Sequence, residues 1–445
     1  MADLCKTKGD LNVMDGFDST PANNVAASAA PSFAANVHLR RLVTSFLLTP
    51  AAAYAIYFAS MSVVEQKTQS SELMGFMILS STLPGFLFAM LAGVVVDRHN
   101  RVRILVFSNL LRLLVAIGFA AATRRASSLP LLLGAIYASN FCLSALLQFS
   151  AAAEDALIPN VVASQQILGA NSITQIVRLA GQGLGAALLA PVLLHLSGAS
   201  LVGVVAIPLL ALSTWVCSRL PRQLGDNGAP SAATWASVWN DLRVGWQFIA
   251  HHPVVRRAII YLALVTVFEL VILTLAPGMA ARVWEISTAY ISYLAVPGGV
   301  GFGVASWLLG RHGHKMEEET WIVCGFLALG GGVALLPALR ELRGLYLLLF
   351  VALSVMIGAG LALIFVPARA VLQKQSPGDV RGRVIATQLF MNNVVSTLPL
   401  PVIGGLADKV GFGPVIVCLA LLSLGVGATG LWHTRKGRRG AALPE

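Results

Sequence analysis

The chain has 445 residues, of which 56% are hydrophobic and only 11% are charged, and its formal net charge is +11. Soluble domains carry about 25% charged residues, so this composition excludes an ordinary water-soluble protein. The mean hydropathy of +0.76 indicates a chain that crosses a membrane several times. The basic residues lie in short loops between apolar runs, which is typical of membrane orientation and not of a nucleic-acid surface.

Residues 1–37 are polar, rich in Ala, Asn and Ser, and lack the basic and then apolar pattern of a signal peptide. We expect a disordered cytoplasmic tail there. Beyond it, apolar runs each approach the roughly 20 residues that a bilayer-spanning helix needs. The predicted spans are 42–64, 73–96, 102–122, 129–151, 167–195, 199–218, 257–281, 288–310, 320–339, 344–366, 384–406 and 412–433.

The spans fall into two groups of six. The predicted organisation is an N-terminal bundle at 38–218, a cytoplasmic linker at 219–256, a C-terminal bundle at 257–433 and a basic cytoplasmic tail at 434–445. Far more Lys and Arg residues fall in the loops on the side of the N-terminus than in the opposite loops. Both ends of the chain are therefore expected in the cytoplasm.

The two halves also share a sequence pattern. Pro84 precedes Arg98 at the same spacing at which Pro297 precedes Arg311, and a glycine follows each proline. Coincidence among residues that are common in membrane helices is the alternative. The position of the second pattern in the equivalent span favours an internal repeat, and hence two pseudo-symmetric bundles.

A short basic loop joins the second and third spans, and it contains Gly93, Asp97, Arg98 and Arg101. The preference of inner loops for basic residues explains the arginines but not a Gly and an Asp at this spacing. The pattern resembles the loop between helices 2 and 3 of the major facilitator superfamily of transporters. The resemblance implies that Gly93 lets two helices approach closely, and that these residues, with Arg311, form a cytoplasmic gate.

Shorter motifs resemble the branch of this superfamily that includes enterobactin exporters and macrolide efflux proteins. They are residues 109–112 (NLLR), 156–159 (ALIP) and 381–384 (RGRV). Two features depart from proton-coupled drug exporters: residues 181–186 (GQGLGA) lack the usual Pro of the fifth span, and residues 140–148 contain no arginine.

Three charged residues lie well inside predicted spans, away from the span ends: Glu269, Arg112 and Arg178. A charge at the bilayer centre costs roughly 2.5–3.5 kcal/mol on insertion scales, so each one needs a reason. Glu269 is the candidate for proton coupling, because a low dielectric favours the protonated carboxyl group; a structural pairing with an arginine is the alternative. Arg178 could attract an anionic substrate or neutralise Glu269, and Arg112 could balance charge or contact substrate.

Polar side chains recur at helical spacing on three spans, so each set lies on one helix face. The sets are Asn140, Ser144 and Gln148; Asn171, Gln175, Arg178 and Gln182; and Gln388, Asn392 and Ser396. Such faces avoid lipid, so they either line a wet cavity or hold helices together. Tyr54 and Tyr57 in the first span are candidates for stacking on a substrate or for packing.

The fold expected from these features is an all-α membrane protein with twelve transmembrane helices in two pseudo-symmetric six-helix bundles. The resemblance implies a secondary active transporter, not an enzyme, that exports a small amphipathic molecule, such as a siderophore or drug-like compound, by proton antiport. Its expected partners are the substrate, a proton or another cation, and the lipid bilayer. We expect a monomer in the bacterial inner membrane, without nucleic acid, cofactor or metal. A lysophospholipid flippase and a non-transporting receptor or scaffold are the alternatives.

Overall fold

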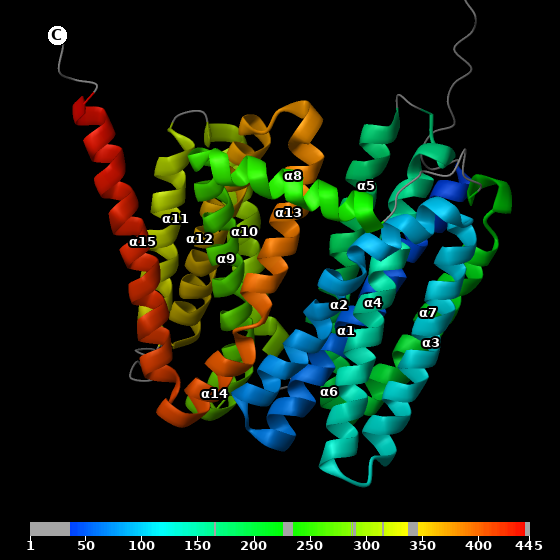
Figure 1. Cartoon of the computed structure of the whole chain (residues 1–445). Coiled ribbons are helices and arrows are strands. Elements are labelled where there is room, and N and C mark those ends of the chain that lie inside the picture. The colour runs from blue at the N-terminus through cyan, green and yellow to red at the C-terminus, as the bar shows by residue number, and fades with distance from the viewer. Residues whose placement is uncertain are drawn as a thin grey trace, which may run out of the picture.

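The computed structural model describes residues 36–163, 166–225, 235–285, 287, 291–313, 316–336 and 346–440. Within these residues every regular element is a helix and none is a strand. Figure 1 shows the helices as two bundles side by side. The predicted all-α fold is confirmed.

The N-terminal bundle, called the N half, follows the predicted spans. It consists of α1 (Val37–Thr68), α2 (Ser71–Arg98), α3 (Arg101–Arg125), α4 (Leu129–Val161), α5 (Ile167–Gly183), the π-helical turn η2 (Leu184–Leu189), α6 (Ala190–Ser197) and α7 (Ala199–Ser218). The residues Asn36, Ser70 and Asn100 are the N-caps of α1, α2 and α3. The side chain of each accepts at least one hydrogen bond from a backbone N–H group of the first turn. Gly198, with a φ of 76°, separates α6 from α7.

The C-terminal bundle, called the C half, follows a helical linker. The linker contains the 3₁₀ turn η3 (Arg222–Gly225) and α8 (Trp235–His251). The C half consists of α9 (Pro253–Gly278), the π-helical turn η4 (Met279–Val283), α10 (Ile291–His312), α11 (Glu318–Leu335), α12 (Tyr346–Gln375), α13 (Gly378–Thr397), α14 (Leu400–Val410) and α15 (Phe412–Gly440).

The described part of each predicted span lies on one of these helices or on consecutive helical segments, which gives six spans in each half of the described chain. Ten of the described helices are long and apolar enough to cross a membrane. The expected tail at 1–37 falls almost entirely outside the described residues. At the other end of the chain, α15 continues as a helix to Gly440, beyond the expected boundary at residue 433.

The molecule has two distinct ends (Figure 1). One end of the molecule, called here the α8 end, holds the start of α1, the end of α15 and helix α8, which lies across the bundle. The opposite end, called the α14 end, holds the α1–α2 connection and the short helix α14, which packs against α2. Two segments far apart in the sequence, one from each half, therefore meet at the α14 end.

Close packing inside the N half depends on two glycines of the fifth span. A Cβ atom at Gly181 would collide with the backbone of Leu47, and one at Gly185 with the backbone of Ala51. Small residues four positions apart let α1 approach α5 and η2 without a gap.

Candidate functional site

The central acidic residue of the molecule is Glu269, in the interior of α9. Protein atoms surround it, but its side chain is exposed to a cavity. Its negative charge acts on the hydroxyl groups of Tyr54 and Tyr57, which come from α1 of the other half. The two tyrosine rings are tilted to each other, with centroids 6.4 Å apart. The structure thus brings three of the predicted site residues together across the boundary between the halves.

The cavity beside Glu269 has a volume of about 360 Å³ and extends into the C half. Its aromatic lining consists of Phe58, Trp284, Phe302 and Phe350, and most of the other lining residues are aliphatic or glycine. Among the described residues that line it, Glu269 alone carries a charge. A carboxylate at the edge of an apolar space is suited to an amphipathic ligand.

The polar face of α4 serves two purposes along its length. Asn140 is buried and donates to Ser60 Oγ on α1 at 2.9 Å, so it holds two helices of the N half together. Gln148 lies farther along the same face, beside Gly85 of α2; Asn393 of the C half reaches the same glycine. Ser144, between them, is half-buried. Asn140 therefore joins α4 to α1 within the N half, whereas Gln148 lies where the halves meet.

The polar face of α13 packs largely against its neighbours. Gln388 is buried, and Ser396 bonds to the backbone of its own helix, at Asn392 O. The side-chain amide of Asn392 donates to Thr266 Oγ1 on α9 at 2.9 Å. The side-chain oxygen of Asn392, Oδ1, is buried and lacks a hydrogen-bond partner among the described residues. Since Thr266 lies one helical turn before Glu269, Asn392 fixes the helix that carries the carboxylate.

The polar face of α5 is not a single cavity wall. Asn171 and Gln175 are exposed, and Gln182 is half-buried. Arg178 pairs with Glu154 Oε2 at 3.4 Å and with Asp155 Oδ1 at 3.1 Å, both on α4. The expectation that Arg178 could neutralise Glu269 is therefore wrong, because its ionic partners lie within the N half.

The other buried arginine belongs to the core of the N half. Arg112 is only 1% exposed. It donates to Asn109 Oδ1 at 2.8 Å and to Ser150 Oγ at 2.6 Å, and the charge of Glu154 acts on it. Arg112 therefore belongs to a buried polar cluster of the N half. Its expected role in charge balance or substrate contact stays a prediction.

The expected cytoplasmic gate lies at the α8 end and does not have its expected packing here. A Cβ atom at Gly93 would have no neighbour within 4 Å, so the close helix approach expected at this glycine is absent. Arg101 donates to the carbonyl of Ala156 on α4 at 3.2 Å, within the N half. Arg311 lies over the ring of Trp307 on its own helix. A latch formed by these residues stays a prediction for another conformation.

At the α14 end, an arginine that sequence reasoning did not select joins the two halves. Arg282, in η4, pairs with Glu65 Oε1 of α1 at 3.1 Å and with Asp408 Oδ1 of α14 at 3.0 Å. It also donates to Ser71 Oγ of α2 at 2.6 Å, and its guanidinium group lies 4.7 Å from the centroid of Phe412. We call Glu65, Arg282 and Asp408 the clamp.

Asp408 gives the clamp a second attachment to the N half. Its carboxylate accepts bonds from the hydroxyl of Ser70 and from the backbone N–H groups of Ser71 and Glu72, at 2.9, 2.9 and 3.0 Å. A residue of α14 therefore caps the first turn of α2, where a negative charge is favoured by the helix dipole. The clamp closes the boundary between the halves at the α14 end.

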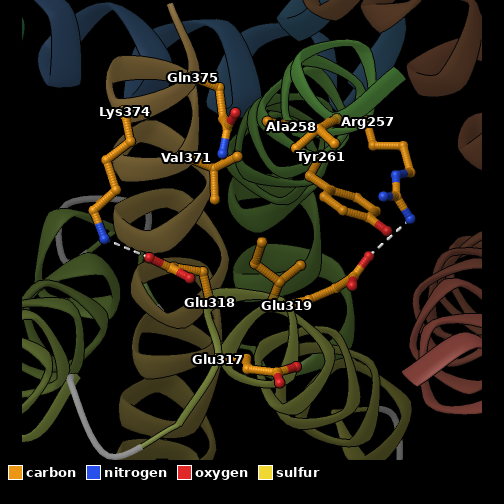
Figure 2. Close-up of a pocket in the computed structure, with 11 residues that line it drawn as sticks. Arg257, Ala258, Tyr261, Glu317, Glu318, Glu319, Val371, Lys374 and Gln375 are labelled. Carbon is orange, nitrogen blue, oxygen red and sulfur yellow. Dashed lines mark hydrogen bonds and ion pairs between the residues drawn. The ribbon is translucent and has the colours of Figure 1, made fainter. Parts of the chain in front are cut away.

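The α8 end of the C half holds a second pocket, of about 260 Å³ (Figure 2). Arg257 of α9 pairs with Glu319 at 3.0 Å, and Lys374 of α12 pairs with Glu318 at 2.6 Å. Both acids lie in the first turn of α11. Figure 2 shows the two ion pairs on opposite sides of this pocket. They tie three helices of one half together in a solvated setting.

Comparison with known proteins agrees with this architecture. The sequence profile of the Major Facilitator Superfamily matches residues 42–399. No curated protein sequence matches the chain.

Several solved structures share the fold at low sequence identity. A peptide transporter POT mutant in complex with sulfate has a TM-score of 0.69 and 12% identity, covering 93% of this chain and 98% of its own. The nucleoside transporter NupG has a TM-score of 0.67 and 13% identity, covering 89% and 98%. A bacterial homologue of the iron transporter ferroportin, in an inward-facing state, has a TM-score of 0.65 and 16% identity, covering 88% and 98%.

Proposed function

Since this chain belongs to the major facilitator superfamily, a family of membrane transporters, we propose that it exports a small amphipathic molecule by proton antiport. One observation carries this proposal. Glu269 is a carboxylate in the interior of a membrane helix, yet it is exposed to a cavity that Phe58 of the other half also lines. A carboxylate placed there can hold either a proton or a cationic group of the substrate.

We place the α8 end in the cytoplasm of a bacterial cell, because its loops hold most of the basic residues of the sequence. The clamp then closes the protein on the outer side of the inner membrane. In this arrangement substrate reaches Glu269 from the cytoplasm, which is the starting point of an export cycle. The motifs shared with enterobactin and macrolide exporters favour a siderophore or drug-like compound as the cargo.

The cycle that follows needs two gates. Substrate binding at Glu269 releases a proton, and the halves rock about the central site. The clamp opens, while Asp97, Arg98 and Arg101 at the end of α2 and the start of α3 latch the cytoplasmic side together with Arg311. A proton from outside then displaces the substrate from the carboxylate and resets the cycle.

The test is proton flux in liposomes that contain the purified protein, challenged with siderophores, cationic drugs and lysophospholipids. We expect substrate-driven proton movement in the wild type and its loss in Glu269→Gln, which keeps the shape of the side chain but cannot exchange a proton. The control is Glu319→Gln, which removes a carboxylate from an exposed ion pair at the α8 end and should retain flux. Undiminished flux in Glu269→Gln would refute the coupling role.

A further inference from the structure

The cavity beside Glu269 is elongated along α9. Glu269 lines one part of it, and Trp284, just beyond η4, lines another. At about 1.5 Å of rise per residue, these two positions lie about 20 Å apart along the helix axis. The intervening walls come from α10, α11, α12 and α15 as well as from α9, so the space runs inside the C half toward the α14 end.

The chemistry of the cavity differs between these two positions. Near Glu269 there is a negative charge, and the hydroxyl groups of Tyr54 and Tyr57 lie within range of its field. Toward Trp284 the walls are apolar, and the rings of Trp284 and Phe350 meet edge to face at 5.3 Å. The indole N–H of Trp284 is buried and has no hydrogen-bond partner among the described residues.

We propose that this cavity binds a cationic amphiphile, with its charged head at Glu269 and its apolar arm along α9 toward Trp284. The inference rests on the proposed transport function, because the same carboxylate serves both. A lone carboxylate selects a cation, and aromatic rings nearby favour it further. A long apolar space selects a ligand with an extended hydrocarbon arm, whose burial supplies the affinity. An anionic head group would meet only repulsion from Glu269.

Two glycines of α10 allow the length of the arm to be tested. Gly299 lines the cavity, and a Cβ atom there would meet nothing within 4 Å. Gly303 lies about one turn farther along the same helix; it has the same freedom at Cβ but does not line the cavity. Gly299→Leu should therefore fill part of the cavity, whereas Gly303→Leu makes the same chemical change outside it.

The experiment measures the binding of alkyltrimethylammonium ions, in single-methylene steps of chain length, to the purified protein in lipid nanodiscs by calorimetry. In the wild type we expect affinity to rise about fourfold per methylene until the cavity is filled, and then to level off. Gly299→Leu should level off at a shorter chain. Gly303→Leu should follow the wild-type curve. Glu269→Gln should weaken binding of the ions but not of uncharged alcohols of equal length.

Two results would overturn the inference: a wild-type curve without a plateau, or Gly299→Leu and Gly303→Leu curves that coincide. The proposed transport function fails separately, through undiminished proton flux in Glu269→Gln. If Glu269→Gln abolishes flux while Gly299→Leu leaves the chain-length curve unchanged, the transport proposal survives and the placement of the apolar arm is wrong.

Discussion

The two ends of the molecule use ion pairs for different purposes. At the α14 end, Arg282 of the C half pairs with Glu65 of the N half, so the contact crosses the boundary between the halves. At the α8 end, the ion pairs between residues whose side chains the structure describes each lie within one half. These are Arg178 with Glu154 and Asp155, Arg257 with Glu319, and Lys374 with Glu318.

Burial separates the clamp from the exposed ion pairs of the C half at the α8 end, whereas the Arg178–Glu154 pair of the N half is also largely buried, with side chains 18% and 6% exposed. The side chain of Glu65 is 1% exposed, whereas those of Arg257 and Glu319 are 50% and 36% exposed. Removing one partner of a buried pair costs about 3–5 kcal/mol, because it leaves an uncompensated charge. Exposed pairs contribute about 0–1 kcal/mol. The clamp can therefore decide which arrangement of the halves is populated, while the exposed pairs keep one half intact as it moves.

The largest effect is expected from Arg282→Gln. This change leaves Glu65 buried without its counter-ion, which should shift the equilibrium away from closure at the α14 end by about 3–5 kcal/mol. A cysteine placed at Phe58, which lines the central cavity, should then react much faster with a membrane-impermeant maleimide added on the α14 side.

The matched control is the double variant Glu65→Gln and Arg282→Gln. Replacing both members of a buried pair removes the uncompensated charge, so most of the effect should disappear. If the double variant reacts as fast as Arg282→Gln alone, loss of the ion pair is not the cause.

A smaller effect is expected where α2 and α14 touch. A Cβ atom at Gly404 would collide with the backbone carbonyl of Ser71, and only separation of the two helices can relieve that collision. Gly404→Ala should therefore disfavour closure by about 1–3 kcal/mol, the usual cost of overpacking. Gly413→Ala, near the same end but with open space at Cβ, should leave maleimide labelling unchanged. Equal labelling rates in the two variants would contradict the close approach of α2 and α14.

The smallest effect is expected at the α8 end. Arg257→Gln breaks an exposed pair within the C half, so its cost to the free energy of unfolding should be about 0–1 kcal/mol. Thermal unfolding in detergent should show only a small shift that fades at high salt, and labelling at the α14 side should not change. An increase in labelling as large as that of Arg282→Gln would remove the contrast between the two ends.

Sequence reasoning predicted the parts of this structure that depend on length and hydropathy. The twelve spans are set by the bilayer thickness, so apolar runs such as 199–218 match their helices closely. Helical spacing also placed polar side chains correctly on shared faces. Helical spacing does not predict which residues these side chains contact, because their partners lie on other helices. Asn140 bonds to Ser60, and Arg178 pairs with acids of α4 and not with Glu269.

The clamp was missed for the same reason, since its members are far apart in the chain. Two signals were present in the sequence. Arg282 is one of the few basic residues in the loops opposite the N-terminus, and basic residues are concentrated in the loops of the other side. Glu65 and Asp408 also lie just beyond the ends of their predicted spans, on the same side as Arg282. Residues of opposite charge at the same membrane level are candidates for pairing, but only packing shows which of them meet.

We infer that the clamp holds the α14 end closed and that the two ends open in alternation. The most direct test is a pair of distance measurements by pulsed spin-label spectroscopy, one between the halves at the α14 end and one between them at the α8 end, in the wild type and in Arg282→Gln. We expect a longer distance at the α14 end and a shorter one at the α8 end in the variant than in the wild type. Unchanged distances, or distances that lengthen at both ends, would contradict this inference.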